Sequence, residues 1–247
     1  MNEPELDLAG VWERHAAWWQ AEFTDGADVE YEEQILPLAG RLLAGAKRVL
    51  DLGCGEGQIA RLVAGAGAER VVGVDTSTAQ LAEAARRGGG VAYTRASAGA
   101  LPLAVRSFDA VVTCLVLEHL HDLDGALDEV VRVLRPGGRF VIFINHPLFQ
   151  TPSSGWIDDH VLDPPEQYWR IGPYLPESVS VEEVDSGVRL PFFHRPLGRY
   201  VNALADRGLY VTRMVEPAPP PGFLAQAPQY VDAATIPRLL LLRAERH

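Results

Sequence analysis

The sequence is poor in cysteine, and this shortage excludes two kinds of protein. Only two cysteines, Cys54 and Cys114, occur among 247 residues. Two widely separated thiols do not make a disulfide framework, and no Cys/His cluster has the spacing of a metal site. We therefore expect no metal site. We expect both cysteines to act as small residues that fill tightly packed space.

Positive charge and long apolar runs are also scarce. The chain carries 22 Lys and Arg against 33 Asp and Glu, a formal net charge of −11. Phosphate contacts need a surplus of basic side chains on one face, so a nucleic-acid partner is not expected. No apolar run approaches the ~20 residues of a membrane span, and the acidic first residues lack the layout of a signal peptide. The sequence predicts a cytoplasmic protein that does not bind membranes.

The composition that is present favours one well-buried domain. Hydrophobic residues make up 47% of the chain, and 247 residues lie near the upper size at which a single core is usual. We expect one domain with embellishments.

A glycine-rich turn organises the chain. In the stretch Arg48–Gly57 (RVLDLGCGEG), branched apolar residues precede Gly53, Gly55 and Gly57. This pattern is typical of a buried parallel strand that breaks into a tight turn, and the apolar spacing after it predicts a helix. Glycines let a ligand approach the backbone, and the amides of such a turn are expected to point toward it. The stretch therefore predicts a nucleotide site.

The spacing of the glycines narrows the kind of nucleotide. A dinucleotide pattern places its third glycine at position 58, where Gln58 stands, whereas the spacing Gly-x-Gly-x-Gly is met. Asp51 lies two residues before the first glycine, and Asp75 ends the next predicted strand. From that position a carboxylate accepts hydrogen bonds from ribose hydroxyls.

Four further blocks extend the pattern beyond the glycine turn. They are Phe108–Val112 (FDAVV), Leu115–Leu120 (LVLEHL), Val133–Phe140 (VLRPGGRF) and Pro237–Arg243 (PRLLLLR). In this order and at these separations the chain resembles a class I S-adenosylmethionine-dependent methyltransferase of the small-molecule, methyltransferase type 11-like branch. The resemblance is strong from about residue 48 to residue 143.

The alternation of strands and helices, together with this resemblance, implies an α/β, Rossmann-like, doubly wound fold. Its seven-stranded sheet is mostly parallel, with an antiparallel last strand between the fifth and sixth. We expect a single class I methyltransferase domain over 1–247: an N-terminal helical lid (1–46), a cofactor-binding core (47–146), a cap insertion (147–192) and the C-terminal part of the sheet (193–247).

The resemblance implies S-adenosylmethionine as cofactor. Ser97 replaces the acid that usually accepts a bond from the adenine amino group, so adenine recognition is expected to rely more on the Ala98 amide. The Leu115 backbone is expected to contact the methionine part. The predicted cofactor-binding residues are Asp51, Gly53, Cys54, Gly55, Gly57, Asp75, Thr76, Ser97, Ala98 and Leu115.

Two aromatic segments are candidates for the acceptor pocket. The helix expected over Val11–Phe23 is aromatic, and Trp19 either packs on the core or belongs to a lid. The segment from His146 to Pro191 is rich in proline with little periodicity, which indicates a functional insertion. Trp156 and Tyr168 are expected in its apolar wall, although a surface or dimer contact is the alternative.

Methyl transfer mainly needs positioning, with a general base only for a protonated acceptor. His146 follows the fifth predicted strand and His194 ends the cap, so these two are the candidate bases. Glu118 and His119 are interpreted as residues that orient a loop.

Two other function classes remain open at this stage. One is a nicotinamide-dependent oxidoreductase, disfavoured by Gln58, and the other is a cofactor-binding regulatory protein without catalysis. The sequence predicts a small, largely apolar acceptor. It leaves open whether oxygen, nitrogen or carbon is methylated, and it leaves the oligomeric state open.

Overall fold

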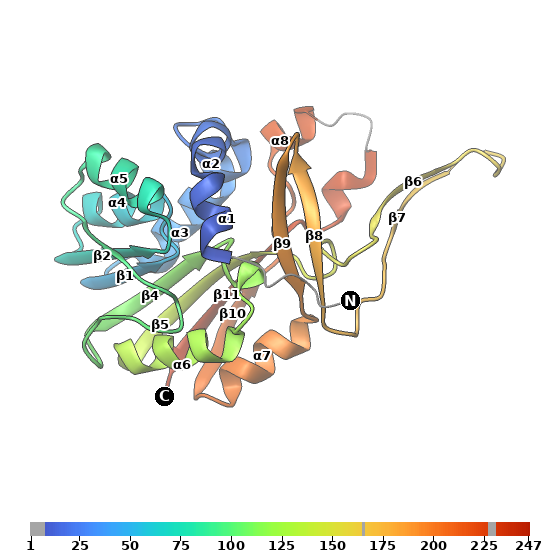
Figure 1. The fold of residues 1–247 in the computed structure, drawn as a ribbon. Coiled ribbons are helices and arrows are strands. Elements are labelled where there is room, and N and C mark those ends of the chain that lie inside the picture. Colours follow the sequence, from blue (N-terminus) through green and yellow to red (C-terminus); the bar gives the residue numbers. More distant parts are fainter. Residues whose placement is uncertain (1–7, 165, 227–230) are drawn as a thin grey trace.

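A computed structural model describes residues 8–164, 166–226 and 231–247 (Figure 1). The first seven residues of the predicted lid lie outside this part of the chain. Every helix in the described residues is too short or too polar to span a lipid bilayer.

A seven-stranded sheet forms the centre of the molecule (Figure 1). The strands in chain order are β1 (Arg48–Leu52), β2 (Arg70–Asp75), β3 (Ala92–Arg95), β4 (Phe108–Cys114), β5 (Leu134–Asn145), β10 (Leu209–Val215) and β11 (Leu239–Arg246). Across the sheet their order is β10-β11-β5-β4-β1-β2-β3. Strand β11 pairs antiparallel with both β5 and β10, whereas β1 to β5 run parallel. The predicted fold class is confirmed.

The path of the chain through the sheet creates a switch point. From β1 the chain moves outward through β2 to β3, then returns to β4 on the other side of β1. In open α/β sheets a ligand crevice lies outside the carboxyl ends of the strands at such a reversal. The ends of β1 and β4 are therefore where a ligand is expected.

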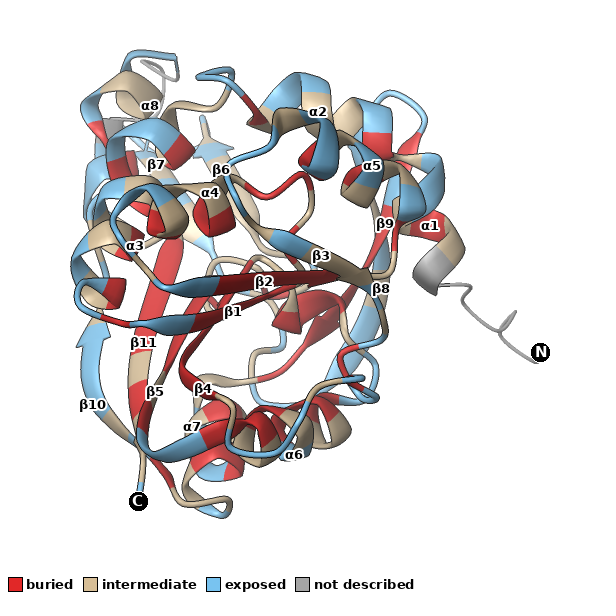
Figure 2. Cartoon of the chain, turned by 90° about the vertical axis from the view of Figure 1, so that its left-hand side faces the viewer, coloured by how far each residue is buried: buried red, intermediate tan, exposed pale blue. Residues whose placement is uncertain are grey.

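Helices cover both faces of the sheet (Figures 1 and 2). One face carries α3 (Leu36–Leu43), α4 (Gln58–Gly65) and α5 (Thr78–Arg87), and the other carries α6 (Leu123–Val133) and α7 (Leu197–Ala205). Because side chains alternate along a strand, Val49 packs with α3 and α4 while its neighbour Leu50 packs with α6 and α7. Figure 2 shows the resulting buried layer along β1, β2, β4 and β5.

The N-terminal segment differs in detail from the expected helices. It forms α1 (Leu8–Arg14) and α2 (Ala16–Phe23), which meet at His15 in place of one continuous helix. Further along, within the segment 1–46 that was expected to be helical, a π-helical turn, η1 (Tyr31–Ile35), continues directly as α3. Pro37 stands in the first turn of α3, where its missing N–H is tolerated, and the wide turn lies immediately before it.

The segment predicted as a cap is more regular than its sequence indicates. It forms two antiparallel hairpins: β6 (Gly155–Asp159) with β7 (Glu166–Arg170), and β8 (Ser178–Asp185) with β9 (Val188–His194). The ribbon of β6 and β7 points away from the body of the molecule (Figure 1). The second hairpin stands beside α1, where Phe192 of β9 belongs to the same apolar cluster as Val11.

Three short helical segments complete the fold. They are the 3₁₀ turn η2 (Leu117–His119) after β4, the helix α8 (Pro221–Gln226) and the 3₁₀ segment η3 (Val231–Thr235) before β11. The first of these begins immediately beyond the switch point and contains His119.

Candidate active site

A cavity of about 390 Å³ lies at the switch point. Its walls come from the loop after β1, the end of β2, the segment after β3, the segment after β4 and the N-terminal helices. Its size falls within the ~300–1,000 Å³ of small-molecule pockets. Nine of the ten predicted cofactor residues line it, namely Asp51, Gly53, Cys54, Gly55, Asp75, Thr76, Ser97, Ala98 and Leu115.

The glycine loop brings backbone close to the cavity. Gly53 has φ +74°, and an added Cβ would stand 2.3 Å from Cγ2 of Val116. A side chain at this position is therefore excluded by both conformation and space. Gly57 begins α4 and is not among the lining residues; an added Cβ there would meet the Tyr93 hydroxyl at 2.3 Å.

The amides of this loop are satisfied within the protein. Gly53 and Cys54 both donate to the Val74 carbonyl, at 2.7 and 3.0 Å, and Gly55 donates to Oδ2 of Asp75 at 2.9 Å. The expectation that the loop amides point toward the ligand is therefore wrong for Gly53, Cys54 and Gly55. The loop is tied to β2, and what it offers a ligand is close approach.

Asp75 holds the loop in place and lines the cavity. Its Oδ1 accepts from the Ser77 amide at 2.8 Å, and its Oδ2 accepts from Gly55. Burial raises the pKa of this carboxyl. Each carboxylate oxygen has a further lone pair, so Asp75 retains the capacity to accept from two ligand hydroxyls.

Asp51 is more enclosed than Asp75. Its Oδ2 accepts from the Ala60 amide at 2.9 Å, in the first turn of α4. Burial raises the pKa of Asp51 to about 7. The Asp51 carboxylate therefore links the end of β1 to the first turn of α4 next to the cavity.

Two further predicted residues have backbone features suited to a site. Ser97 accepts a bond from the Gly99 amide at 3.3 Å, which shapes the loop that contains Ala98. Leu115 has φ +55°, a left-handed conformation that is uncommon for a branched residue and is found where surrounding structure enforces it. Its amide donates to the Phe143 carbonyl at 2.8 Å.

The N-terminal segment covers the cavity with aromatic rings. Trp12, Trp19 and Tyr31 line it. The Trp19 ring stacks on Phe23 with centroids 4.2 Å apart, and its edge faces Trp12 at 5.8 Å. Trp19 thus lines the cavity and also packs against the core cluster of α3 and α4, and its contribution to a lid stays a prediction.

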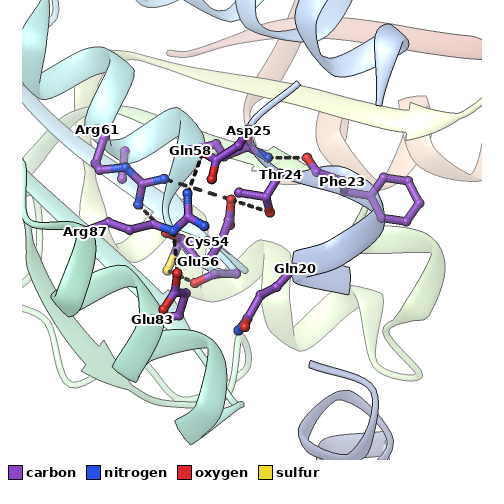
Figure 3. Close-up of polar contacts among 12 residues, drawn as sticks. Gln20, Phe23, Thr24, Asp25, Cys54, Glu56, Gln58, Arg61, Glu83 and Arg87 are labelled. Atoms are coloured by element: carbon purple, nitrogen blue, oxygen red, sulfur yellow. Dashed lines mark hydrogen bonds and ion pairs between the residues drawn. The ribbon is translucent and has the colours of Figure 1, made fainter. Parts of the chain in front are cut away.

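Polar contacts join the end of the N-terminal segment to residues of the glycine loop, α4 and α5 (Figure 3). Gln58 donates to the Phe23 carbonyl at 2.7 Å, and Thr24 donates to Oε1 of Glu56 at 3.2 Å. Asp25 pairs with Arg87 of α5 at 2.7 Å. Glu56 is buried, and burial raises the pKa of its carboxyl.

The structure does not bring the two predicted bases to the cavity. His146 Nε2 lies 2.9 Å from Oε1 of Glu216, and its Nδ1 accepts from the Leu148 amide at 3.1 Å. His194 Nε2 lies 2.7 Å from the Tyr174 carbonyl. Neither is a lining residue of the cavity, because Nε2 of each histidine is turned to a partner outside it.

The predicted acceptor residues Trp156 and Tyr168 also lie elsewhere. They belong to β6 and β7, the ribbon that points away from the body of the molecule (Figure 1), and neither lines the cavity. Trp156 instead packs edge-on against Trp169, with centroids 5.5 Å apart.

His119 is the site residue whose position the sequence interpretation missed. It is buried, lines the cavity and contacts the rings of Trp12 and Phe192, at centroid distances of 4.9 and 4.6 Å. Burial lowers its pKa to about 4. Its place in the block LVLEHL was the available signal, but the contact with β9 that orients the ring joins residues 72 positions apart.

The chemistry of the lining suits a cationic cofactor with a ribose. Among the described lining residues four are Asp or Glu (Asp51, Glu56, Asp75 and Asp122), and none is Lys or Arg. Aromatic faces and acids together favour a positive charge. No group of three or more His, Cys, Asp or Glu in the described part of the chain is arranged to hold a metal ion.

Comparisons with known proteins agree with this geometry. Residues 50–142 match a family described as a methyltransferase domain. The O-methyltransferase rstn1 of Aspergillus nomiae is 32% identical over 168 residues, which are 59% of this chain and 75% of that protein. The demethylmenaquinone methyltransferase of Thermus thermophilus is 40% identical over 123 residues, 47% of this chain and 54% of that one.

Solved structures extend the match to most of the chain. An S-adenosylmethionine-dependent methyltransferase from Mesorhizobium loti superposes with a TM-score of 0.73 at 30% identity, covering 85% of this chain and 96% of that chain. Curated sequences match over less: the chain spans about half the length of the first such relatives.

Proposed function

Since the chain belongs to the class I S-adenosylmethionine-dependent methyltransferases, we propose that it transfers the methyl group of S-adenosylmethionine to a small, largely apolar acceptor. The observation that carries the proposal is the cavity at the switch point, which combines a glycine loop, the Asp75 carboxylate and an aromatic lid. When bound, the cofactor supplies a methyl group on a positively charged sulfur.

The residues of the cavity suit the parts of this cofactor. Asp75 has free lone pairs for the ribose hydroxyls, and the loop of Ser97 and Ala98 would hold adenine. Because Gly53 and Gly55 have no side chains, the cofactor could approach the backbone of the loop closely. Leu115 would contact the methionine part of the cofactor. The carboxylates and the Trp19 ring favour the positive charge of the bound cofactor.

The protein acts mainly by positioning. The aromatic rings of the N-terminal segment line the cavity, and the hairpin of β8 and β9 packs against that segment through Phe192 and Val11. Exclusion of water beneath these rings would keep an acceptor close to the methyl group. The hydrogen bond from Gln58 to the Phe23 carbonyl would therefore support catalysis indirectly. It would hold the N-terminal segment over the cavity without touching the reacting atoms.

The chemical nature of the acceptor is inferred from the residues that line the cavity. Trp12, Trp19 and Leu120 are apolar. The matched relatives include one named an O-methyltransferase and one named a ubiquinone/menaquinone biosynthesis C-methyltransferase. The net charge of −11 disfavours a nucleic acid as acceptor. We place the acceptor beneath the lid, and not along the ribbon that carries Trp156 and Tyr168.

Calorimetric titration with S-adenosylmethionine tests the proposal. We expect saturable binding that Asp75→Ala weakens by ~1.5–3 kcal/mol, because bonds to a charged acceptor are lost. Asp206→Asn is the matched control, since Asp206 is exposed after α7. Absence of binding in the unaltered protein would refute the proposal.

Two further measurements on the same protein distinguish the methyltransferase from an oxidoreductase and from a non-catalytic cofactor-binding protein. NADH is titrated in parallel, and tighter binding of NADH would favour an oxidoreductase. A protein that binds the methyl donor but yields no S-adenosylhomocysteine with any hydroxylated or quinol acceptor would instead be a non-catalytic binder.

A further inference from the structure

His119 has one ring nitrogen engaged by the protein and one directed to no protein partner. Nδ1 lies 2.7 Å from the carbonyl oxygen of Pro191 in β9. A carbonyl only accepts, so Nδ1 carries the proton and Nε2 carries a lone pair. Among the described residues, Nε2 has no hydrogen-bond partner.

The surroundings keep this imidazole in one orientation. The rings of Trp12 and Phe192 both pack against it, and the η2 turn fixes its backbone, whose amide donates to the Val116 carbonyl at 2.9 Å. The residue is 5% exposed and lines the cavity. Because the ring is buried and its pKa is lowered to about 4, it is neutral at physiological pH.

The charges around the cavity limit the acceptor that would meet this nitrogen. The described lining residues contain four carboxyl groups and no Lys or Arg. A carboxylate or phosphate acceptor would therefore bring negative charge without a cationic partner from the chain. A neutral hydroxyl has no such penalty, and it can donate to a free lone pair.

We propose that His119 accepts the hydroxyl proton of a neutral phenol or enol, and that this hydroxyl is the feature by which the site recognises its acceptor. This inference rests on the proposed function and names the substrate class. His121, the other lining histidine, has its ring against Phe193 at 5.6 Å and is not assigned this role.

The step is balanced without another reactant. An electron pair of the acceptor forms the bond to the methyl carbon while the carbon–sulfur bond breaks, and its pair stays on sulfur. The hydroxyl proton passes to Nε2 and then to solvent. Because the attacking oxygen becomes more acidic as its new bond forms, a weak base is sufficient. For attack by a ring carbon, loss of the same proton enriches that carbon in electrons.

Three fluorinated probes separate recognition of the hydroxyl from apolar binding. They are 6-fluoro-2-naphthol, 6-fluoro-2-naphthoate and 2-fluoronaphthalene, titrated into protein loaded with S-adenosylhomocysteine and followed by ¹⁹F NMR. We expect the naphthol to bind at least tenfold more tightly than either of the others. A naphthoate that binds as tightly as the naphthol would overturn the proposal.

Two substitutions at His119 test the roles of its two ring nitrogens individually. In His119→Asn the side-chain NH₂ replaces Nδ1–H toward Pro191 and no acceptor replaces Nε2, so the preference for naphthol is expected to vanish. In His119→Gln the amide oxygen reaches the place of Nε2, so binding is expected to recover while methyl transfer to the naphthol stays at least tenfold slow. His160→Gln, on the exposed end of the first hairpin, is the control.

The histidine ring also gives a direct signal. The ¹⁵N resonance of His119 Nε2 should shift with the naphthol and not with the fluoronaphthalene. Loss of the naphthol preference in His121→Asn or His146→Asn, with the preference intact in His119→Asn, would overturn the assignment. Absence of S-adenosylhomocysteine binding would refute the proposed function and this inference with it, whereas normal cofactor binding without naphthol preference would refute only the inference.

Discussion

Glu118 and His119 are an acid and a base adjacent in the chain, and they face different partners. Glu118 Oε1 accepts from the amide and the side chain of Asn145 at 3.0 and 3.3 Å, whereas His119 Nδ1 donates to Pro191. Burial shifts their pKa values in opposite directions, to about 7 for Glu118 and about 4 for His119. Both shifts favour the neutral form, because burial penalises charge.

Glu118→Gln is expected to make the protein less sensitive to rising pH. Since the folded pKa is raised above the unfolded one, the folded state binds more protons between the two values, and stability falls as pH rises through that window. Relative to Glu118→Gln, the unaltered protein should lose about 2 kcal/mol of unfolding free energy between pH 5 and pH 8. Urea unfolding at both pH values measures this, and a pH-independent difference would contradict it.

His119→Asn is expected to change the pH dependence with the opposite sign. The folded pKa is lowered, so the unfolded state binds more protons and stability is lost as pH falls from about 6.5 toward 4. Between pH 7 and pH 5 the unaltered protein should lose about 2 kcal/mol more than the variant. Thermal unfolding at matched ionic strength checks the slope, and equal slopes would show that His119 is not buried as described.

Gln58→Ala is expected to loosen the lid. It removes the hydrogen bond to the Phe23 carbonyl, worth about 1 kcal/mol, so bound cofactor should dissociate about fivefold faster. Acrylamide should also quench the fluorescence of Trp12, Trp18 and Trp19 more strongly. Arg86→Ala is the control, because Arg86 pairs with Glu83 on the exposed side of α5. An identical response of the two variants would argue against the lid contact.

Gly53→Ala is expected to destabilise the protein and narrow the cavity. The new Cβ would stand 2.3 Å from Val116 Cγ2 at a backbone with φ +74°, and such strain costs at least about 1–3 kcal/mol. In the double variant Gly53→Ala/Val116→Ala, the part of the lost stability that comes from the collision with Val116 should be recovered. The part that comes from the strained backbone at φ +74° should remain. Gly65→Ala is the comparison, since nothing lies within 4 Å of its added Cβ. Additive effects in a double-mutant cycle would exclude the collision.

Local sequence patterns were sufficient for the sheet. Strand β1 and its glycine turn, or β4 with its seven buried residues, have apolar patterns that a parallel sheet requires. The alternation in Ser178–Asp185 (SVSVEEVD) is also a strand pattern. The prolines elsewhere in the segment from His146 to Pro191 nevertheless led to an irregular cap being expected. The pairing of β8 with β9 corrects that expectation.

The side chains of the site were less accessible to sequence reasoning. Asp75 was identified because its position follows from one strand and one loop. His119 and His146 both follow strands, and only the contact of η2 with β9 directs one of them to the cavity. The loop amides were misjudged for the same reason, since their acceptor Val74 lies on another strand. Predictions failed where an orientation depended on a partner distant in sequence.

The antiparallel strand β11 has a consequence for synthesis of the protein. It lies between β5 and β10 although both are translated before it. Until residues 239–246 leave the ribosome, the apolar edge of β5 from Phe140 to Ile144 has no neighbour on that side. An unpaired apolar edge invites association with other chains. The nascent protein should therefore engage chaperones until this strand is inserted, and ribosome stalling just before residue 239 should prolong that engagement.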